Sequence, residues 1–241
     1  MVANEPGQPA PSPGAWSIDL DVPRVALAIG AHPDDIEFGA GATLAKWALA
    51  GCVVHHLVLT DGSKGTWNPD ADIAALVHDR QVEQRAAARI VNGDRDAGTV
   101  TFLGQIDGEL THSVALRADV VRCIREIRPD VVLGHDPWKR YRLHPDHRNA
   151  GLVTCDAIVA ARDPHFHRDQ GLTHHRPATL LLWEADAADH VEDVTGFVDA
   201  KLHALEAHES QFESTMKATD EAQIEAFRVR IRERLSGLGA A

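Results

Sequence analysis

The sequence lacks the features that would place it in a disulfide-rich or membrane-embedded class. Its 241 residues include only 3 cysteines, Cys52, Cys123 and Cys155, which are far apart and form no Cys-x-x-Cys pair. This pattern excludes a disulfide framework and a cysteine-based zinc site, and we expect reduced thiols in a cytoplasmic protein. No apolar run approaches the roughly 20 residues of a membrane-spanning helix, so we expect no membrane span.

Basic residues are also in deficit. The chain has 24 Lys and Arg against 36 Asp and Glu, a formal net charge of -12. Nucleic-acid binding draws on a surplus of positive charge, so we predict no nucleic-acid partner. Histidine, in contrast, is plentiful: many of the 15 histidines fall in three groups, at His55-His56, His144 to His147 and His165 to His175. Because imidazole is a common metal ligand, these groups are candidate metal sites.

Apolar segments with strand and helix patterns alternate along the chain. The Pro- and Gly-rich residues 1–20 are expected to form a disordered leader, and 21–241 a single domain. The predicted strands are Val25–Gly30, Val53–Thr60, Thr99–Leu103, Asp130–Asp136 and Thr179–Trp183, and the predicted helices are Phe38–Ala50, Ile73–Val91, Val114–Arg128, Asn149–Ala161, Val198–Phe212 and Glu221–Leu235. This alternation is typical of an α/β fold, a Rossmann-like, mostly parallel sheet with helices on both faces.

The most informative stretch is the buried strand Val25–Gly30 and the turn after it. That turn brings together His32, Asp34 and Asp35. In open α/β sheets, ligands bind at the carboxyl ends of the strands, where this turn would lie. Neighbouring carboxylates repel each other unless a cation or a shared proton relieves them, so the turn predicts a divalent metal site. A dinucleotide site is excluded, because Leu44 replaces the third glycine of the G-x-G-x-x-G pattern.

A second group of candidate ligands lies at the start of a predicted helix. His144 and His147 are three residues apart and therefore share one helix face. With His32 and Asp35 they supply enough nitrogen and oxygen ligands for a tetrahedral metal with one open position, as in catalytic zinc sites. Such a metal makes water a nucleophile, and Asp34 would then be free to act as the general base.

Four motifs carry a resemblance to a known family. They are Ala31-His-Pro-Asp-Asp35 with Glu37, Leu59-Thr-Asp-Gly-Ser-Lys-Gly65, Phe102-Leu-Gly104 followed by Asp107-Gly108, and His144-Pro-Asp-His147. In this order they resemble the PIG-L/LmbE-like family of metal-dependent N-deacetylases, which includes N-acetylglucosaminyl-phosphatidylinositol, mycothiol and bacillithiol pathway deacetylases. The resemblance runs from about Arg24 to Gln211.

The resemblance implies a role for each matching residue. It implies that His32, Asp35 and His147 hold Zn²⁺, and that Asp34 is the general base. It further implies that a protonated His144 stabilises the oxyanion, and that Asp146 orients that imidazole. In relatives the acidic residue at the position of Asp107 contacts substrate hydroxyls, and Lys64 and Arg142 are candidates for the substrate rim. Fe²⁺ suits the same ligands as Zn²⁺.

These observations predict a zinc-dependent hydrolase that removes an N-acetyl group from an amino sugar or a related small conjugate. Two alternatives stay open: an amidase of a larger thiol conjugate or glycosylated natural product, and a non-catalytic carbohydrate- or metal-binding module. The substrate, the physiological metal and the assembly of a homo-oligomer are left open. The role of the His165 to His175 loop is also left open: it could be a second metal site, a lid or a polar loop. It is equally open whether Tyr141 or Arg142 replaces a mobile tyrosine of some relatives.

The residues Arg80, Glu83 and Arg85 of the predicted helix Ile73–Val91 are expected to form a solvated or paired stripe.

Overall fold

The computed structural model describes residues 17–239, whose centre is a five-stranded parallel sheet. The strand order is β4-β3-β2-β5-β6, with β2 at Val25–Gly30, β3 at Val53–Thr60, β4 at Val100–Gln105, β5 at Val131–His135 and β6 at Thr179–Trp183. The helices are α1 (Asp35–Leu49), α2 (Ile73–Val91), α3 (Val114–Ile127), α4 (Pro145–Arg162), α5 (Val198–Glu206) and α6 (Glu221–Gly239). The predicted α/β fold is confirmed.

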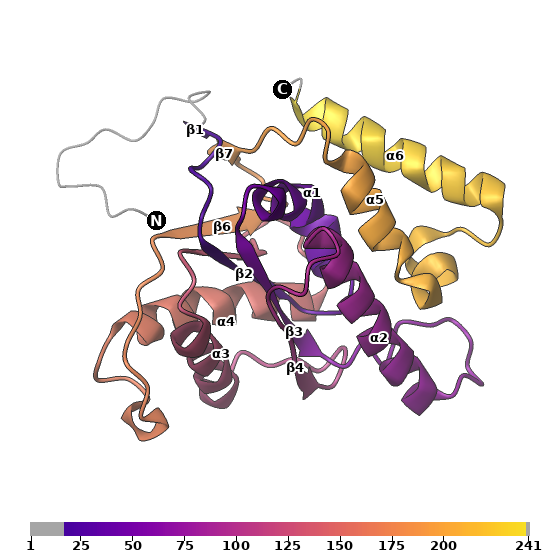
Figure 1. Cartoon of the computed structure of the whole chain (residues 1–241). Helices are drawn as coiled ribbons and strands as arrows, with labels where there is room; N and C mark the ends of the chain where they lie inside the picture. Colours follow the sequence, from indigo (N-terminus) through magenta and orange to yellow (C-terminus); the bar gives the residue numbers. More distant parts are fainter. Residues whose placement is uncertain (1–16, 240–241) are drawn as a thin grey trace.

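Two helical layers enclose the sheet, as Figure 1 shows. Helices α3 and α4 pack on one face, and α1, α2 and α5 lie on the other. The central strand β2 contributes side chains to both faces of the sheet. Leu27 and Ile29 contact the α3 and α4 layer, while Ala26 and Ala28 face α1. Successive side chains of a strand point to opposite faces, so an uninterrupted apolar strand serves two cores.

Helix α1 packs close to the edge strand β6 at a glycine. A Cβ atom added at Gly39 would lie 2.5 Å from the ring of Trp183. The glycine therefore lets this indole lie directly against the helix, with its Nε1 pointing toward His135 at the end of β5. A third, smaller core between α5 and α6 includes Leu202, Phe227 and Ile231.

Several predicted boundaries shift in the structure. Helix α4 begins at Pro145 instead of Asn149, because proline is well suited to the first helical position, where no backbone donor is needed. The helix predicted to run from Val198 to Phe212 ends at Glu206, and a 3₁₀ turn (Glu209–Gln211) and a π-helical turn (Phe212–Met216) follow it. The break comes at His208, whose backbone is not helical (φ -88°, ψ 62°).

The leader predicted over residues 1–20 extends too far. Ser17–Ile18 (β1) pairs in parallel with His190–Val191 (β7), and the Leu20 N–H donates to the Glu192 carboxylate. The part of the prediction that concerns residues 1–16 lies outside the described residues. Within residues 17–239, no helix combines the length and the apolar character needed to cross a bilayer.

Candidate active site

Polar residues from four loops meet at the carboxyl edge of the sheet. The loop after β2 carries His32 and Asp34, and α1 begins at Asp35. The loop after β3 carries Asp61 and Lys64, the loop after β4 carries Asp107, and His144 and His147 lie at the start of α4 beyond β5. Short hydrogen bonds join these loops: the Asp107 N–H donates to Asp61 Oδ1 (3.0 Å), the Lys64 N–H to Asp107 Oδ2 (3.0 Å), and the Gly108 N–H to Asp146 Oδ2 (2.6 Å). Hydrogen bonds between these segments therefore hold the polar residues of the edge together in one site.

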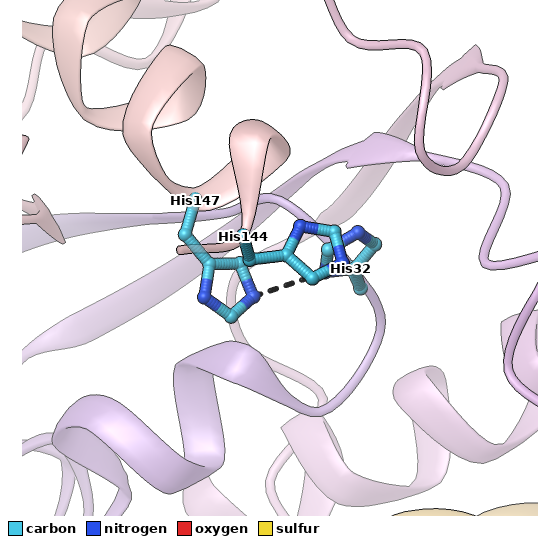
Figure 2. A group of neighbouring side chains, drawn as sticks. All are labelled: His32, His144 and His147. Carbon is cyan, nitrogen blue, oxygen red and sulfur yellow. Dashed lines mark hydrogen bonds between the residues drawn. The ribbon is translucent and has the colours of Figure 1, made fainter. Parts of the chain in front are cut away.

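The three predicted metal ligands lie side by side. Nδ1 of His32 is 3.2 Å from Nε2 of His147 and 3.3 Å from Oδ2 of Asp35, and Nε2 of His147 is 3.2 Å from Oδ1 of Asp35. Figure 2 shows the His144 and His147 rings extending from the start of α4 toward His32.

These separations are similar to those between the ligands of a tetrahedral metal, although the two imidazoles approach different oxygens of the Asp35 carboxylate. Ligand atoms about 2.0 to 2.1 Å from a zinc ion lie roughly 3.3 Å from one another. Two imidazole nitrogens and one carboxylate also form the donor set of a catalytic site with one open position. Three groups in the described residues have donor atoms close enough to share an ion: His32, His144 and His147; Asp35, His135 and His147; and His32, Asp107 and Asp146. The predicted ligands His32, Asp35 and His147 are divided between the first two groups.

Two carboxylates support the far side of the His32 ring. Its Nε2 lies 3.1 Å from Asp146 Oδ2 and 3.2 Å from Asp107 Oδ1. Burial opposes the charged form, but the hydrogen bonds to Asp107, Asp146 and Asp35 outweigh it and raise the His32 pKa well above its usual value. A carboxylate on the second nitrogen of a ligating histidine fixes the tautomer and the ring orientation. The Asp146 carboxylate thus orients His32, which differs from the predicted contact with the His144 ring.

His144 caps helix α4. Its Nδ1 accepts a hydrogen bond from the Asp146 backbone N–H at 3.2 Å, so a neutral ring carries its proton on Nε2. Partial burial and the neighbouring His32 and His147 lower the pKa of His144, which favours that neutral ring. The oxyanion role predicted for His144 would therefore not require the imidazolium that the resemblance implies, because a neutral ring with its proton on Nε2 is also a hydrogen-bond donor.

Asp34 adopts an unusual backbone conformation next to the ligands. Its φ of 97° and ψ of -27° lie in the left-handed region, which costs a non-glycine residue about 1 to 3 kcal/mol. Burial raises the pKa of its carboxyl to about 6 against the opposing effect of Arg80. A base whose pKa is close to neutrality matches general acid–base chemistry near pH 7.

The three predicted substrate contacts all have partners within the protein. Asp107 is buried, and its carboxylate accepts a hydrogen bond from the backbone N–H of Lys64. The Lys64 ammonium donates to the Asp107 carbonyl (2.5 Å) and to Glu109 (3.0 Å). Arg142 is buried, and its guanidinium donates to Glu184 (3.2 Å) and approaches His135. Lys64 is half exposed and is the member of this set that solvent reaches most readily.

Sequence reasoning missed His135 as a residue of the site. It ends β5, is buried, and its Nε2 lies 3.2 Å from Asp35 Oδ2. Its Nδ1 accepts from the Trp183 indole N–H at 3.1 Å, which leaves the Nε2 proton of a neutral ring for Asp35. The available signal was its position: a histidine at the carboxyl end of a buried strand lies at the edge where ligands bind.

Comparison with known proteins gives a consistent result. Residues 27–158 match the family model described as "PIG-L: GlcNAc-PI de-N-acetylase". Diacetylchitobiose deacetylase of Thermococcus kodakarensis is 35% identical over 195 residues, which cover 80% of this chain and 71% of that protein. The 1D-myo-inositol 2-acetamido-2-deoxy-alpha-D-glucopyranoside deacetylase of Streptomyces avermitilis is 34% identical over 174 residues, 63% of this chain and 58% of that relative.

A solved structure agrees with these sequence matches. The N,N'-diacetylchitobiose deacetylase of Pyrococcus horikoshii superposes with a TM-score of 0.78 at 27% identity, covering 88% of this chain and 76% of that one. The matched residues 27–158 include His32, Asp34, Asp35 and the His144 to His147 segment, so the family match covers the edge described above. The chain therefore belongs to the PIG-L/LmbE-like deacetylase family and, by homology, is an amide hydrolase.

Proposed function

We propose that this protein is a zinc-dependent N-deacetylase that removes the acetyl group from an N-acetylated amino sugar or a related small conjugate. The observation that carries the proposal is the triangle of His32 Nδ1, the Asp35 carboxylate and His147 Nε2, with separations of 3.2 to 3.3 Å, directly beside Asp34. The relatives support the substrate class, since their names specify diacetylchitobiose and a 2-acetamido-2-deoxy-glucopyranoside.

The residues of the site divide the work of amide hydrolysis. A divalent ion held by His32, Asp35 and His147 would polarise the acetamido carbonyl and acidify water at that position. Asp34 takes the proton of the attacking water and delivers it to the leaving amine. The Nε2–H of His144 donates to the oxygen that becomes negatively charged, a contribution of about two to three powers of ten in rate for such a donor. His135, Asp107 and Asp146 keep the ligand side chains in place.

The decisive experiment is a substrate screen with the purified protein. We would supply Zn²⁺ or Fe²⁺ and measure the primary amine released from diacetylchitobiose, N-acetylglucosamine and an inositol-linked N-acetylglucosamine, with and without a chelator. We expect the amount of primary amine to rise with time when the metal is present and to stay constant when the chelator removes it. With the corresponding amino sugar that carries no acetyl group, the amount of amine should not rise. No amine release from any acetamido sugar, together with less than one ion per chain after reconstitution, contradicts the proposal.

One observation favours a second candidate, a larger conjugate as substrate. The loops that carry Lys64, Asp107 and His144 also carry exposed large apolar side chains, namely Trp67, Ile106, Trp138, Tyr141 and Leu143. A contiguous exposed apolar patch marks an interaction site, and these five side chains lie on the loops that carry the site residues. Including acylated thiol conjugates and N-acylated glycosides with apolar aglycones in the same screen distinguishes the two candidates by kcat/KM.

A further inference from the structure

Asp34 is held in its left-handed conformation by contacts from a distant helix. Asp34 caps α1 without a side-chain capping bond, so the capping interaction that usually fixes such a residue does not hold it. Its backbone N–H instead donates to Oε1 of Gln84 at 2.9 Å. Gln84 lies in α2, 50 residues further along the chain, and is fully buried. The backbone N–H of the proposed base is therefore held by an amide side chain of α2.

The orientation of the Gln84 amide follows from its partners. A backbone N–H can only donate, so the oxygen of the amide must face Asp34. The nitrogen then faces Glu37 and donates to its Oε1 at 2.8 Å, while His56 Nδ1 lies 3.3 Å away. Glu37, His56 and Gln84 are all completely buried. Water therefore does not compete for these hydrogen bonds, and a rotated amide would lose both of them.

A second side chain of α2 holds the peptide before Asp34. Arg80, one helical turn before Gln84, donates to the Pro33 carbonyl at 2.6 Å and lies 3.4 Å from Asp34 Oδ2. Its other terminal nitrogen donates to the Gly62 carbonyl at 2.9 Å. The carbonyl and the N–H of the single peptide group between Pro33 and Asp34 are thus both held by side chains of one helix.

We propose that Gln84 is a positioning residue for catalysis, which holds Asp34 in the left-handed conformation that directs its carboxylate to the reacting water. This inference rests on the proposed function, because it assumes that Asp34 is the general base. It assigns Gln84 no contact with substrate or metal. Its effect should therefore appear in kcat and in the position of Asp34, and not in substrate or metal affinity.

The test compares Gln84→Met with a control variant on the same helix. Methionine keeps the length and burial of glutamine and removes both hydrogen bonds. The control is Glu83→Gln, which disturbs the bonds of Glu83 to Ser210 (2.7 and 2.6 Å) on another side of α2. We expect Gln84→Met to lower kcat about 10- to 100-fold, the range seen when support for a catalytic group is lost, with KM and bound metal unchanged. Glu83→Gln should keep the wild-type kcat.

A rescue variant separates positioning from a general loss of structure. The double variant Gln84→Glu with Glu37→Gln exchanges the amide and the carboxylate. The new carboxylate at position 84 can accept from the Asp34 N–H, and the new amide at position 37 can donate to that carboxylate. We expect this double variant to recover most of the lost kcat. If Gln84→Met does not fold, Gln84→Asn, which keeps an amide but shortens it, gives the same comparison.

Crystal structures of the variants decide the conformational claim without any activity. In Gln84→Met, residue 34 should leave the left-handed region or its carboxylate should move away from the ligand triangle. An unchanged Asp34, or a kcat that falls only in proportion to the folded fraction, overturns the inference. A wild-type protein that hydrolyses no acetamido substrate would refute the proposed function, whereas the position of Asp34 in the variant would still decide whether Gln84 holds it.

Discussion

Two histidine-rich segments of this chain have similar compositions and different surroundings. His144 and His147 open α4 at the carboxyl edge of the sheet, where they face His32 and Asp35. The segment from His165 to His175 lies on the other side of the molecule, below α3 and α4 in Figure 1. There the His175 ring bonds to the carbonyl of Pro129, just before β5 begins, at 2.8 Å.

The partners of the imidazoles explain the difference. At the carboxyl edge the rings meet carboxylates and other rings from separate loops, whereas in the His165 to His175 loop the His175 ring bonds to a backbone carbonyl and the His167 ring lies beside Phe166. None of the three candidate ion-binding groups in residues 17–239 includes a residue of this loop. In this chain, the histidine segment that meets carboxylates and rings from other loops is therefore the one that joins candidate ion-binding groups.

The largest expected effect separates the two segments directly. His147→Ala should remove bound metal and lower kcat/KM by about three powers of ten or more, because a metal contributes several kcal/mol to such a transition state. His165→Ala should change neither quantity. Metal content by plasma emission spectrometry and acetate release measure the contrast. Equal metal content in the two variants would contradict the assignment of the site.

Asp34→Asn should remove activity without removing the metal. The side chain keeps its size and loses its basicity, so kcat should fall about 10²- to 10⁴-fold, the contribution of a positioned general base. Metal stoichiometry should stay at the wild-type value, since the ligand triangle does not include Asp34. Loss of the ion together with activity would instead make Asp34 a ligand.

The protonation state of His144 can be tested with two substitutions. His144→Ala removes the donor and should lower kcat about 10²- to 10³-fold. His144→Gln keeps an N–H donor of similar reach, so it should retain more activity if the neutral ring is the working form. If the two variants have equally low kcat, the positive charge of an imidazolium is required, and the assignment of a neutral His144 ring is wrong.

The smallest expected effect concerns His135, which supports the site without being part of the predicted triangle. His135→Gln should raise the metal dissociation constant about 10- to 100-fold, as when the partner of a metal ligand is removed. Competition with a fluorescent chelator measures this constant. A loss as complete as that of His147→Ala would identify His135 as a direct ligand in the group with Asp35 and His147.

The sequence allowed much of the fold to be predicted, together with the edge of the sheet at which the candidate ligands meet. The uninterrupted apolar strand Val25–Gly30 implied burial on both faces, and the bounds predicted for Ile73–Val91 and Thr179–Trp183 agree with the structure. The turn from His32 to Asp35 could be placed at the carboxyl edge because that edge follows from strand direction alone. Candidate ligands next to a strand end were therefore predictable.

Residues within α2 were not predictable in the same way. Arg80 was expected in a solvated or paired stripe. It is not solvated but buried beneath the loop after β3, and its ionic partner is Asp34 of the loop after β2 instead of a neighbour on the same helix. A side chain at Gly62 or Gly65 would collide with its guanidinium, so the two glycines make the burial of Arg80 possible. Helical periodicity indicates that residues share a face, but it does not show which loop will cover that face.

By itself, the sequence determined the alternation of strands and helices, the edge at which the site lies, and the residue types that can bind a metal there. Only the tertiary structure decided that Asp146 orients His32, that His135 contacts Asp35, and that Gln84 holds Asp34. The physical reason is separation along the chain. These contacts join residues 114, 100 and 50 positions apart, and their geometry depends on how whole elements pack, which no local pattern specifies.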